Sequence, residues 1–255
     1  MSNISFTKYQ GAGNDFILFD DRKREFPAGV PALIRKMCHR QFGVGADGVI
    51  LLQLNPIPDA DFQMRIFNSD GFEASSCGNG LRCLVRFLLD LGVVQKKYRI
   101  KTQERVVVAS LDQGMPVIDM GSPEKLRLEV ATEAGVVHCV DTGAPHAVQF
   151  VPDVDLIDVL ASGGMIRRSL HMNVNFASFS KDRSIRVRTF EKGVEGETLS
   201  CGTGAAAVVT IASRLYGLKG PISIWFRGGR LDVWEEEGRI FLSGPAEKVF
   251  TGSFP

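Results

Sequence analysis

Two apolar runs, each opened by the same short motif, constrain this chain more than any other feature. Cys77-Gly-Asn-Gly-Leu-Arg leads into a run from Leu81 to Leu91, and Cys201-Gly-Thr-Gly-Ala-Ala leads into a run from Ala205 to Ala212. The first run has only three polar side chains, spaced four residues apart, and the second has almost none. A helix without a broad polar face has to be buried. The pattern therefore predicts strands wrapped around a central helix, built twice.

Short alternating runs separated by turn residues, such as Pro56-Ile-Pro-Asp, predict that strands dominate the rest of the chain. Two further helices are expected, from Pro31 to Arg40 and from Leu156 to Arg168. The fold class is therefore expected to be α+β. The predicted strands are Phe16–Phe19, Val49–Leu54, Phe62–Phe67, Tyr98–Lys101, Val106–Ser110, Arg127–Val130, Ala147–Val151, Ser184–Phe190, Ile222–Phe226 and Arg239–Leu242.

Weak internal similarity indicates a duplication. Gly11-Ala-Gly-Asn-Asp-Phe-Ile-Leu-Phe is similar to Thr142-Gly-Ala-Pro-His-Ala-Val-Gln-Phe, and one cysteine motif follows each stretch. We expect two pseudo-symmetric domains with a boundary near Met115–Asp119. Residues 1–117 would form the first, completed by a C-terminal strand at 247–255, and residues 118–246 would form the second.

Composition limits the partners. The 30 Lys and Arg residues against 29 Asp and Glu residues give a net charge of +1, so no basic excess is available for nucleic acid. The longest apolar stretch is too short to span a membrane, and the first residues do not resemble a signal peptide. We expect a cytoplasmic protein whose five cysteines are reduced thiols.

The two motif cysteines, each preceded by a serine (Ser76 and Ser200), have a context suited to acid–base chemistry. The amide N–H groups and dipole at a helix start favour a thiolate. Inverting an α-carbon requires a proton to leave one face and another to reach the opposite face, so two fixed thiols suit the reaction. The glycines that follow expose backbone N–H groups that can hold a carboxylate.

Six stretches, in order and spanning nearly the whole chain, resemble the diaminopimelate epimerase family. They are Gly11-Ala-Gly-Asn-Asp-Phe, Asn68-Ser-Asp-Gly-Phe-Glu, Cys77-Gly-Asn-Gly, Gly143-Ala-Pro-His, Asn173-Val-Asn-Phe and Glu191-Lys-Gly-Val-Glu-Gly-Glu-Thr-Leu-Ser-Cys-Gly-Thr-Gly. The resemblance implies an isomerase that interconverts LL- and meso-diaminopimelate for lysine and peptidoglycan precursor synthesis. It implies that no pyridoxal phosphate is used, and we expect no other cofactor and no metal. It also implies two domains, each a barrel-like sheet around a central helix, with the active site in the cleft between them, and a homodimer is a further expectation.

The resemblance also assigns roles to residues. It makes Cys77 and Cys201 the acid–base pair and places His146 and Glu191 next to the thiols, where they assist proton transfer or engage the substrate amine. The substrate-binding residues that it implies are Asn14, Asn68, Gly78, Asn79, Asn173, Glu191, Lys192, Gly202 and Thr203.

Three positions depart from the family pattern. Gly48 stands where the family usually has glutamine, Ala144 where it has asparagine, and Lys192 where it has arginine. In the family these positions serve the distal amino-acid end of the substrate. Losing two amides and a bidentate guanidinium should weaken distal recognition. We therefore expect tolerance of other substrates, with glutamate as a candidate.

Several simpler interpretations compete with these roles. Cys38, Cys83 and Cys139 are expected to be buried structural thiols. The asparagines could be turn residues or helix caps, and Glu191 with Lys192 could be a solvated pair. Cys38-His39 and His138-Cys139 lack zinc-site spacing, and Gly11-Ala-Gly13 lacks the third glycine of a dinucleotide site.

Two other functional classes also use such features. A thiol–disulfide redox protein needs paired cysteines, and a non-catalytic amino-acid-binding module needs the glycine-lined helix starts. Among enzymes of similar fold, retention of both cysteines disfavours an isomerase without the thiol pair. The flanking motifs disfavour a proline racemase.

Overall fold

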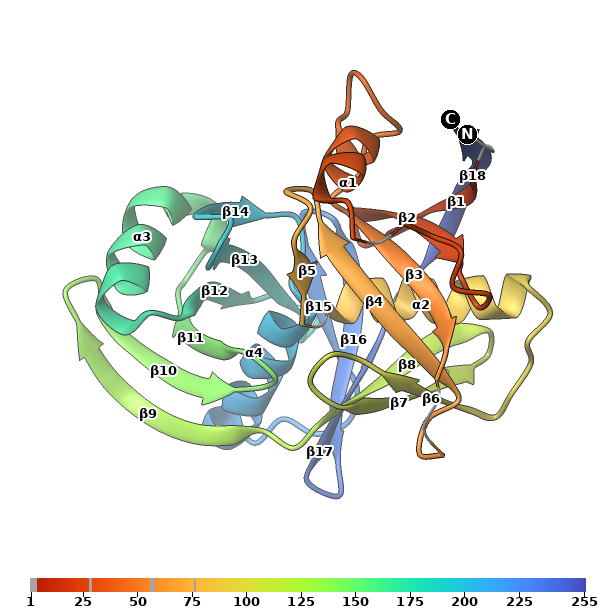
Figure 1. Ribbon diagram of the computed structural model, residues 1–255. Helices are drawn as coiled ribbons and strands as arrows, with labels where there is room; N and C mark the ends of the chain where they lie inside the picture. Colours follow the sequence, from red (N-terminus) through yellow and green to blue (C-terminus); the bar gives the residue numbers. More distant parts are fainter. Residues whose placement is uncertain (1–3, 28, 56–57, 76) are drawn as a thin grey trace. The chain divides into compact units, whose positions relative to one another are not determined.

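A computed structural model describes residues 4–27, 29–55, 58–75 and 77–255 of the chain (Figure 1). Ser76 and the first half of the turn expected at Pro56–Asp59 lie outside these residues. The chain folds into two compact units. The first comprises Met1–Ile118 together with Pro245–Pro255, and the second comprises Asp119–Gly244.

The first unit contains a mixed sheet with the strand order β18-β1-β2-β3-β4-β6-β7-β8. Successive pairs are antiparallel except for β2–β3 and β4–β6, which are parallel. The short β5 pairs with the C-terminal end of β4, at Ile66 and Phe67. The elements are β1 (Ile4–Gly11), β2 (Asn14–Asp20), α1 (Pro31–Cys38), β3 (Gly48–Leu54), β4 (Phe62–Asn68), β5 (Glu73–Ala74), α2 (Gly78–Asp90), β6 (Lys97–Lys101), β7 (Val106–Asp112), β8 (Met115–Gly121) and β18 (Glu247–Phe254).

The second unit contains a sheet with the order β9-β10-β11-β12-β13-β15-β16-β17. Its parallel pairs, β11–β12 and β13–β15, stand at the same places in the order as those of the first unit. The elements are β9 (Glu124–Thr132), β10 (Gly135–Asp141), β11 (Pro145–Phe150), the 3₁₀ turn η1 (Val154–Leu156), α3 (Val159–Leu170), β12 (Asn173–Phe179), β13 (Ile185–Glu191), β14 (Gly196–Thr198), α4 (Gly202–Tyr216), β15 (Ile222–Phe226), β16 (Gly229–Glu236) and β17 (Arg239–Ser243).

The two apolar runs form the helices that the sheets surround. In α4, residues 205–212 are all at most 1% exposed, and the helix contacts β10, β11 and β12 as well as β16 and β17. In α2, even Arg82 is fully buried, and the helix contacts β18 and β1 to β4. The prediction that both runs are buried helices is confirmed.

A second helix in each unit covers the outer face of the sheet. In the first unit, Ile34 and Met37 of α1 pack into a core that includes Phe6, Ile17 and Val49. In the second unit, α3 packs on β12 and β13, as Figure 1 shows. Each sheet therefore has helices on both faces, which buries its central strands on two sides.

The predicted helix from Leu156 to Arg168 is partly wrong. Two separate elements begin in this stretch, each after an aspartate N-cap. Asp153 caps η1, and Asp158 caps α3 by accepting the backbone N–H of Ala161 with its side chain. The α-helix therefore begins at Val159. Its Gly163 is a packing residue, since a Cβ there would lie 2.6 Å from Cβ of Phe190.

Within the described residues, no helix is long and apolar enough to cross a membrane.

Candidate active site

Cys77 is the N-cap of α2 in the first unit. Its backbone is extended, with φ of −154°, and its Sγ accepts the backbone N–H of Gly80 at 3.4 Å. The first N–H groups of a helix have no partner within the helix, so a sulfur at this place receives both a hydrogen bond and the positive end of the helix dipole. The predicted cysteine at a helix start is confirmed.

The side-chain neighbour of Cys77 is an oriented asparagine. Asn14, at the end of the β1–β2 hairpin, donates through Nδ2 to the Asp47 carboxylate at 2.5 Å. Its Oδ1 therefore faces the helix start, where it lies 3.8 Å from Cys77 Sγ and accepts from Asn79 Nδ2 at 3.3 Å. Three residues predicted from the sequence, Asn14, Cys77 and Asn79, thus form one cluster.

Arg82 supplies a positive charge one turn into α2. Its guanidinium donates to Asn79 Oδ1 at 3.0 Å and to Gly78 O at 3.5 Å, while its Nε has no hydrogen-bond partner among the described residues. Burial lowers the pKa of this guanidinium, yet arginine keeps its charge near neutrality. The charge interacts favourably with a Cys77 thiolate.

Cys201 is the N-cap of α4 in the second unit and repeats the cap of Cys77. Its φ is −140°, and its Sγ accepts from Gly204 N at 3.3 Å. Thr203 Oγ1 lies 3.4 Å from the same sulfur. Thr142 holds this helix start in place by donating its hydroxyl to Thr203 O at 2.8 Å.

His146 lies behind Thr203 and is fully buried. Its Nε2 is 2.9 Å from Thr203 Oγ1, and its Nδ1 is 2.9 Å from Asn175 Nδ2. Burial lowers the pKa of His146 to about 3, so the imidazole is neutral near neutral pH. Both ring nitrogens are occupied by these partners. Its link to Cys201 runs through the Thr203 hydroxyl.

Asn173, Glu191 and Lys192 lie at neighbouring strand ends. Asn173, at the start of β12, accepts the backbone N–H of Lys192 at 2.9 Å and donates to Pro145 O at 3.3 Å. Glu191, which is half-buried, ends β13, and the Lys192 side chain is exposed. Asn173 therefore ties the ends of three segments together and keeps one amide hydrogen for a ligand.

Comparison with known proteins identifies the family. The sequence pattern of the family described as Diaminopimelate epimerase matches residues 6–126 and 138–249. A diaminopimelate epimerase of Aromatoleum aromaticum is 39% identical over 98% of both chains. One from Archaeoglobus fulgidus is 39% identical over 98% of this chain and 95% of its own. The chain belongs to the diaminopimelate epimerase family.

Membership of the epimerase family confirms the predicted resemblance, the enzyme class of isomerase and the link to lysine biosynthesis. Family membership does not favour the alternatives of a thiol–disulfide redox protein or a non-catalytic amino-acid-binding module. Solved structures share the fold at low identity. A PhzF-family phenazine biosynthesis protein of Bacillus anthracis has a TM-score of 0.79 at 14% identity, covering 100% of both chains. A probable proline racemase of Agrobacterium radiobacter has 0.73 at 18%, covering 99% of this chain and 93% of its own.

Two positions of the epimerase pattern lie side by side in the first unit. Asn68 ends β4 with an exposed side chain and pairs across the sheet with Gly48. A Cβ at Gly48 would lie 2.5 Å from the backbone oxygen of Phe67. A glutamine could therefore not replace Gly48 without a shift of the β3–β4 backbone.

The remaining thiols of this epimerase are buried and structural. Cys38 lies in α1, Cys83 in α2 and Cys139 in β10, each at most 4% exposed. Burial raises the pKa of Cys38 and of Cys83 to about 12 and also raises that of Cys139. The predicted burial of these three cysteines is confirmed.

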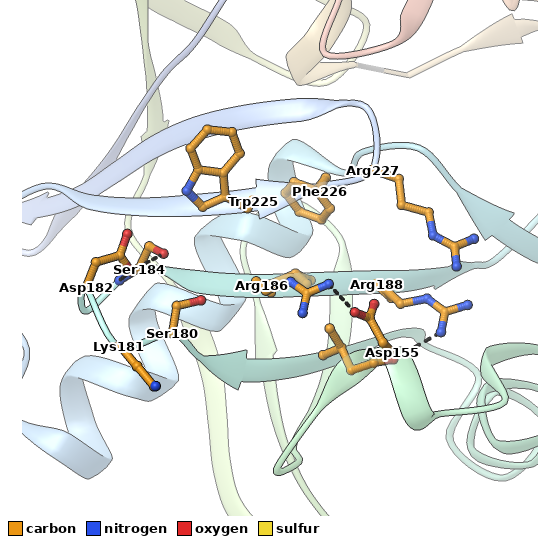
Figure 2. A pocket seen from close by; sticks show the side chains of 12 residues that line it. Asp155, Ser180, Lys181, Asp182, Ser184, Arg186, Arg188, Trp225, Phe226 and Arg227 are labelled. Atoms are coloured by element: carbon orange, nitrogen blue, oxygen red, sulfur yellow. Dashed lines mark hydrogen bonds and ion pairs between the residues drawn. The ribbon is translucent and has the colours of Figure 1, made fainter.

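A separate groove of about 610 Å³ lies in the second unit between η1, β13 and β15 (Figure 2). Of the residues described, none of the predicted site residues lines it. Figure 2 shows Arg186 directed toward Asp155, 2.5 Å away, and Arg188 is paired with Glu197 at 2.7 Å. The arginines that line the groove are paired with carboxylates of the protein, so the groove presents little uncompensated charge.

Sequence reasoning missed four residues around the thiols, namely Asp47, Arg82, Thr142 and Asn175. Arg82 belongs to the narrow polar stripe of the first apolar run, and a charged residue in an otherwise apolar buried helix is a signal in itself. Asn175 lies between Val174 and Phe176 in a strand of which every residue but the last is buried. A polar amide in such a strand must be hydrogen-bonded, which could have marked it as a site residue.

Proposed function

We propose that Cys77 and Cys201 invert the α-carbon of diaminopimelate as an acid–base pair. The observation that carries the proposal is the shared cap: each sulfur accepts the N–H of the third helical residue of a buried helix, at 3.4 and 3.3 Å. Both sulfurs therefore lie where a thiolate is stabilised. In one direction a thiolate takes the α-hydrogen, the electron pair stays on the substrate, and the other thiol protonates the opposite face.

The backbone N–H groups of the two helix starts would hold the α-carboxylate and the charge that develops beside it. Gly78 and Asn79 in the first unit, and Gly202 and Thr203 in the second, are the first residues of α2 and α4. Their N–H groups have no intrahelical acceptor. Stabilising charge at the reacting centre with preorganised donors is a large term in catalysis of this kind.

The side chains near the helix starts would bind the rest of the substrate. We assign this role to Asn14, Asn68, Asn173, Glu191 and Lys192. Asn68 and Lys192 are exposed, and Asn14 and Asn173 are held by other residues in fixed orientations. His146 would assist indirectly by orienting Thr203.

The two units would act as two epimerase domains, residues 1–117 with 247–255 and residues 118–246, with the substrate in the cleft between them. Their equal strand order supports this division. A cytoplasmic location, where the thiols stay reduced, and a homodimer are also part of the proposal.

Deuterium exchange tests the two-thiol mechanism. LL-diaminopimelate would be incubated in deuterated water with wild type, Cys77→Ser, Cys201→Ser and the control Cys139→Ala. We expect wild type and the control to invert the substrate and incorporate deuterium at the α-carbon, and each serine variant to lose at least about a thousandfold in inversion. Near wild-type epimerisation in either serine variant would refute the mechanism.

A broader substrate range is the second proposal. It rests on Gly48, where the backbone excludes a side chain, and on Ala144 and Lys192, which offer fewer hydrogen bonds to a distal group than asparagine and arginine. A substrate that ends in a plain carboxylate, such as glutamate, would then be tolerated. Racemisation of L-glutamate would be measured beside LL-diaminopimelate, and no turnover at high enzyme concentration would contradict it.

A further inference from the structure

An unbroken chain of hydrogen bonds runs through the second unit and ends at the Cys201 sulfur. Thr189 Oγ1 lies 2.9 Å from Asn175 Oδ1, and Asn175 Nδ2 lies 2.9 Å from His146 Nδ1. His146 Nε2 lies 2.9 Å from Thr203 Oγ1, which lies 3.4 Å from Cys201 Sγ. This series of hydrogen bonds thus links β13, β12 and β11 to the start of α4.

One backbone carbonyl determines which groups donate and which accept along this series of hydrogen bonds. Asn175 Nδ2 lies 3.2 Å from Ala147 O, and a carbonyl oxygen only accepts hydrogen bonds. The NH₂ group of Asn175 therefore faces both Ala147 O and His146 Nδ1. It follows that Nδ1 accepts and carries no hydrogen, while Asn175 Oδ1 accepts from the Thr189 hydroxyl.

The form of His146 determines which group donates in the hydrogen bond to Thr203, and therefore which group donates between Thr203 and Cys201. His146 is neutral, because burial lowers its pKa to about 3, so its single ring hydrogen is on Nε2 and is donated to Thr203 Oγ1. The Thr203 oxygen is then an acceptor toward His146, and its own hydrogen is available for Cys201 Sγ. A hydroxyl that donates to a sulfur stabilises the thiolate.

We propose that Asn175 is a positioning residue for the epimerase reaction, which fixes the Nε2–H form of His146 and so makes Thr203 a hydrogen-bond donor to the Cys201 thiolate. The proposal rests on the two-thiol function above. The hydrogen bond from Thr203 prepares Cys201 to act as the base. The α-hydrogen then goes to Cys201 as a proton, the electron pair stays on the substrate, and the Cys77 thiol supplies the replacing proton.

The packing at the start of α4 is built around this asparagine. A Cβ at Gly204 would lie 2.4 Å from Asn175 Oδ1, so only glycine allows the amide to approach the helix start. The corresponding neighbour of Cys77 is Asn14 Oδ1, an acceptor. A donor directed at the sulfur through a histidine is therefore particular to the second unit among the described contacts.

Alkylation of the substrate-free enzyme tests the donor. Iodoacetamide would be applied across a pH range, and the modification of Cys201 and Cys77 would be followed separately by peptide mass spectrometry. Thr203→Val and Asn175→Leu should move the midpoint of the Cys201 profile to higher pH and slow its alkylation near neutrality by about tenfold. The Cys77 profile should not move, because both residues belong to the hydrogen-bond series that ends at the Cys201 sulfur.

Two controls separate ionisation from packing. Thr203→Ser keeps the hydroxyl and should keep the wild-type Cys201 midpoint. Thr210→Val removes a buried threonine hydroxyl from the same helix, one bonded to Ala206 O, and should also leave the midpoint unchanged. An unchanged midpoint in Thr203→Val, or an equal shift in Thr210→Val, would overturn the proposal.

The histidine form can be read directly in the wild-type enzyme, whatever the variants' stability. Nitrogen chemical shifts of ¹⁵N-histidine-labelled protein show which ring nitrogen carries the hydrogen, with the His146 signal assigned by a His146→Gln variant. We expect hydrogen on Nε2 near neutral pH, and hydrogen on Nδ1 would overturn the proposal. Neither measurement uses a substrate, so a failure here differs from a failure of epimerisation in deuterated water.

Discussion

The starts of α2 and α4 have the same backbone and different chemistry. Both begin with a cysteine N-cap whose sulfur accepts from the third helical N–H. Around Cys77 the neighbours are an amide oxygen and a buried guanidinium, whereas Cys201 is joined to a neutral chain of hydroxyl, imidazole and amide groups. The two units thus share the cysteine cap, while the side chains around each thiol differ.

The two sheets show how closely the units correspond. Both have two antiparallel pairs, a parallel pair, an antiparallel pair, a second parallel pair and two more antiparallel pairs. Strand order is determined by backbone hydrogen bonds and sequence connectivity, which tolerate almost any apolar side chain. Function-specific contacts depend on single polar groups, which a duplicated copy can replace.

The largest contrast is expected between alanine substitutions at the two motif glycines. In Gly204→Ala the new Cβ meets Asn175 Oδ1 at 2.4 Å, and that amide is buried and hydrogen-bonded on both sides. In Gly80→Ala it meets the end of Ile50 at 2.9 Å, which can rotate away. We expect the free energy of unfolding to fall by about 3 kcal/mol for Gly204→Ala and to change by less than about 1 kcal/mol for Gly80→Ala.

Urea unfolding of both variants beside wild type would measure this contrast. Both substitutions gain similar helix propensity, so each is the control of the other for that effect. Equal destabilisation of the two variants would show that the amide of Asn175 does not require Gly204.

Acid should weaken the second unit before the first. His146 has a pKa of about 3 when folded against 6.5 when exposed, so unfolding takes up a proton between these values. Its stabilising effect is complete above pH 6.5 and is lost at about 1.4 kcal/mol per pH unit as the pH falls toward 3. In the first unit, burial of Asp15 is outweighed by hydrogen bonds from Arg40 and Lys8, which lower its pKa to about 2, so its contribution is lost only below about pH 4.

Hydrogen exchange at pH 7 and pH 5 would compare the amides of β11 and α4 with those of β1 and β2. We expect protection to fall more in the second unit. His138→Gln serves as the control, since burial lowers the pKa of that half-buried histidine as well but it does not contact the chain to Cys201. Equal loss of protection in both units would contradict the assignment to His146.

The smallest expected effect concerns the charge beside Cys77. Arg82→Met removes a buried guanidinium whose desolvation is costly, so stability should change little, while alkylation of Cys77 near neutral pH should slow by about tenfold. Arg86→Met, one turn later and paired with Asp90, is the matched control and should leave both thiols unchanged. Slowing of Cys201 to the same extent would show that Arg82 does not act specifically on Cys77.

Strands that depend on a local pattern of apolar and turn residues could be predicted from the sequence. All ten predicted strands are strands in the structure, because alternation and turn residues act over a few neighbouring positions. Several strands were not predicted, among them Asn173–Phe179, which is buried on both faces apart from Phe179 and does not alternate. The start of α3 was misplaced by three residues because Asp153 and Asp158 are both suitable caps.

The candidate site was predictable where a motif carries it and not where several strands meet. Cys77, Asn14 and Asn79 were found from motifs and lie together. The role of Asn175 depends on Ala147 in β11, Thr189 in β13 and Gly204 in α4, which no local pattern brings together. His146 was expected next to a thiol, and the intervening Thr203 hydroxyl became visible only with the helix in place.

The pairing of β18 with β1 has a consequence for how the chain reaches its folded state. Phe254 pairs with Ile4 and Glu247 with Gln10, so the sheet of the first unit is finished by residues almost the whole chain apart (Figure 1). The second unit is continuous and inserted between the two parts of the first. During synthesis from the N-terminus, the inserted unit can therefore complete its sheet while β1 still lacks its partner. The unit that begins first is therefore completed only after the whole inserted unit has been synthesised.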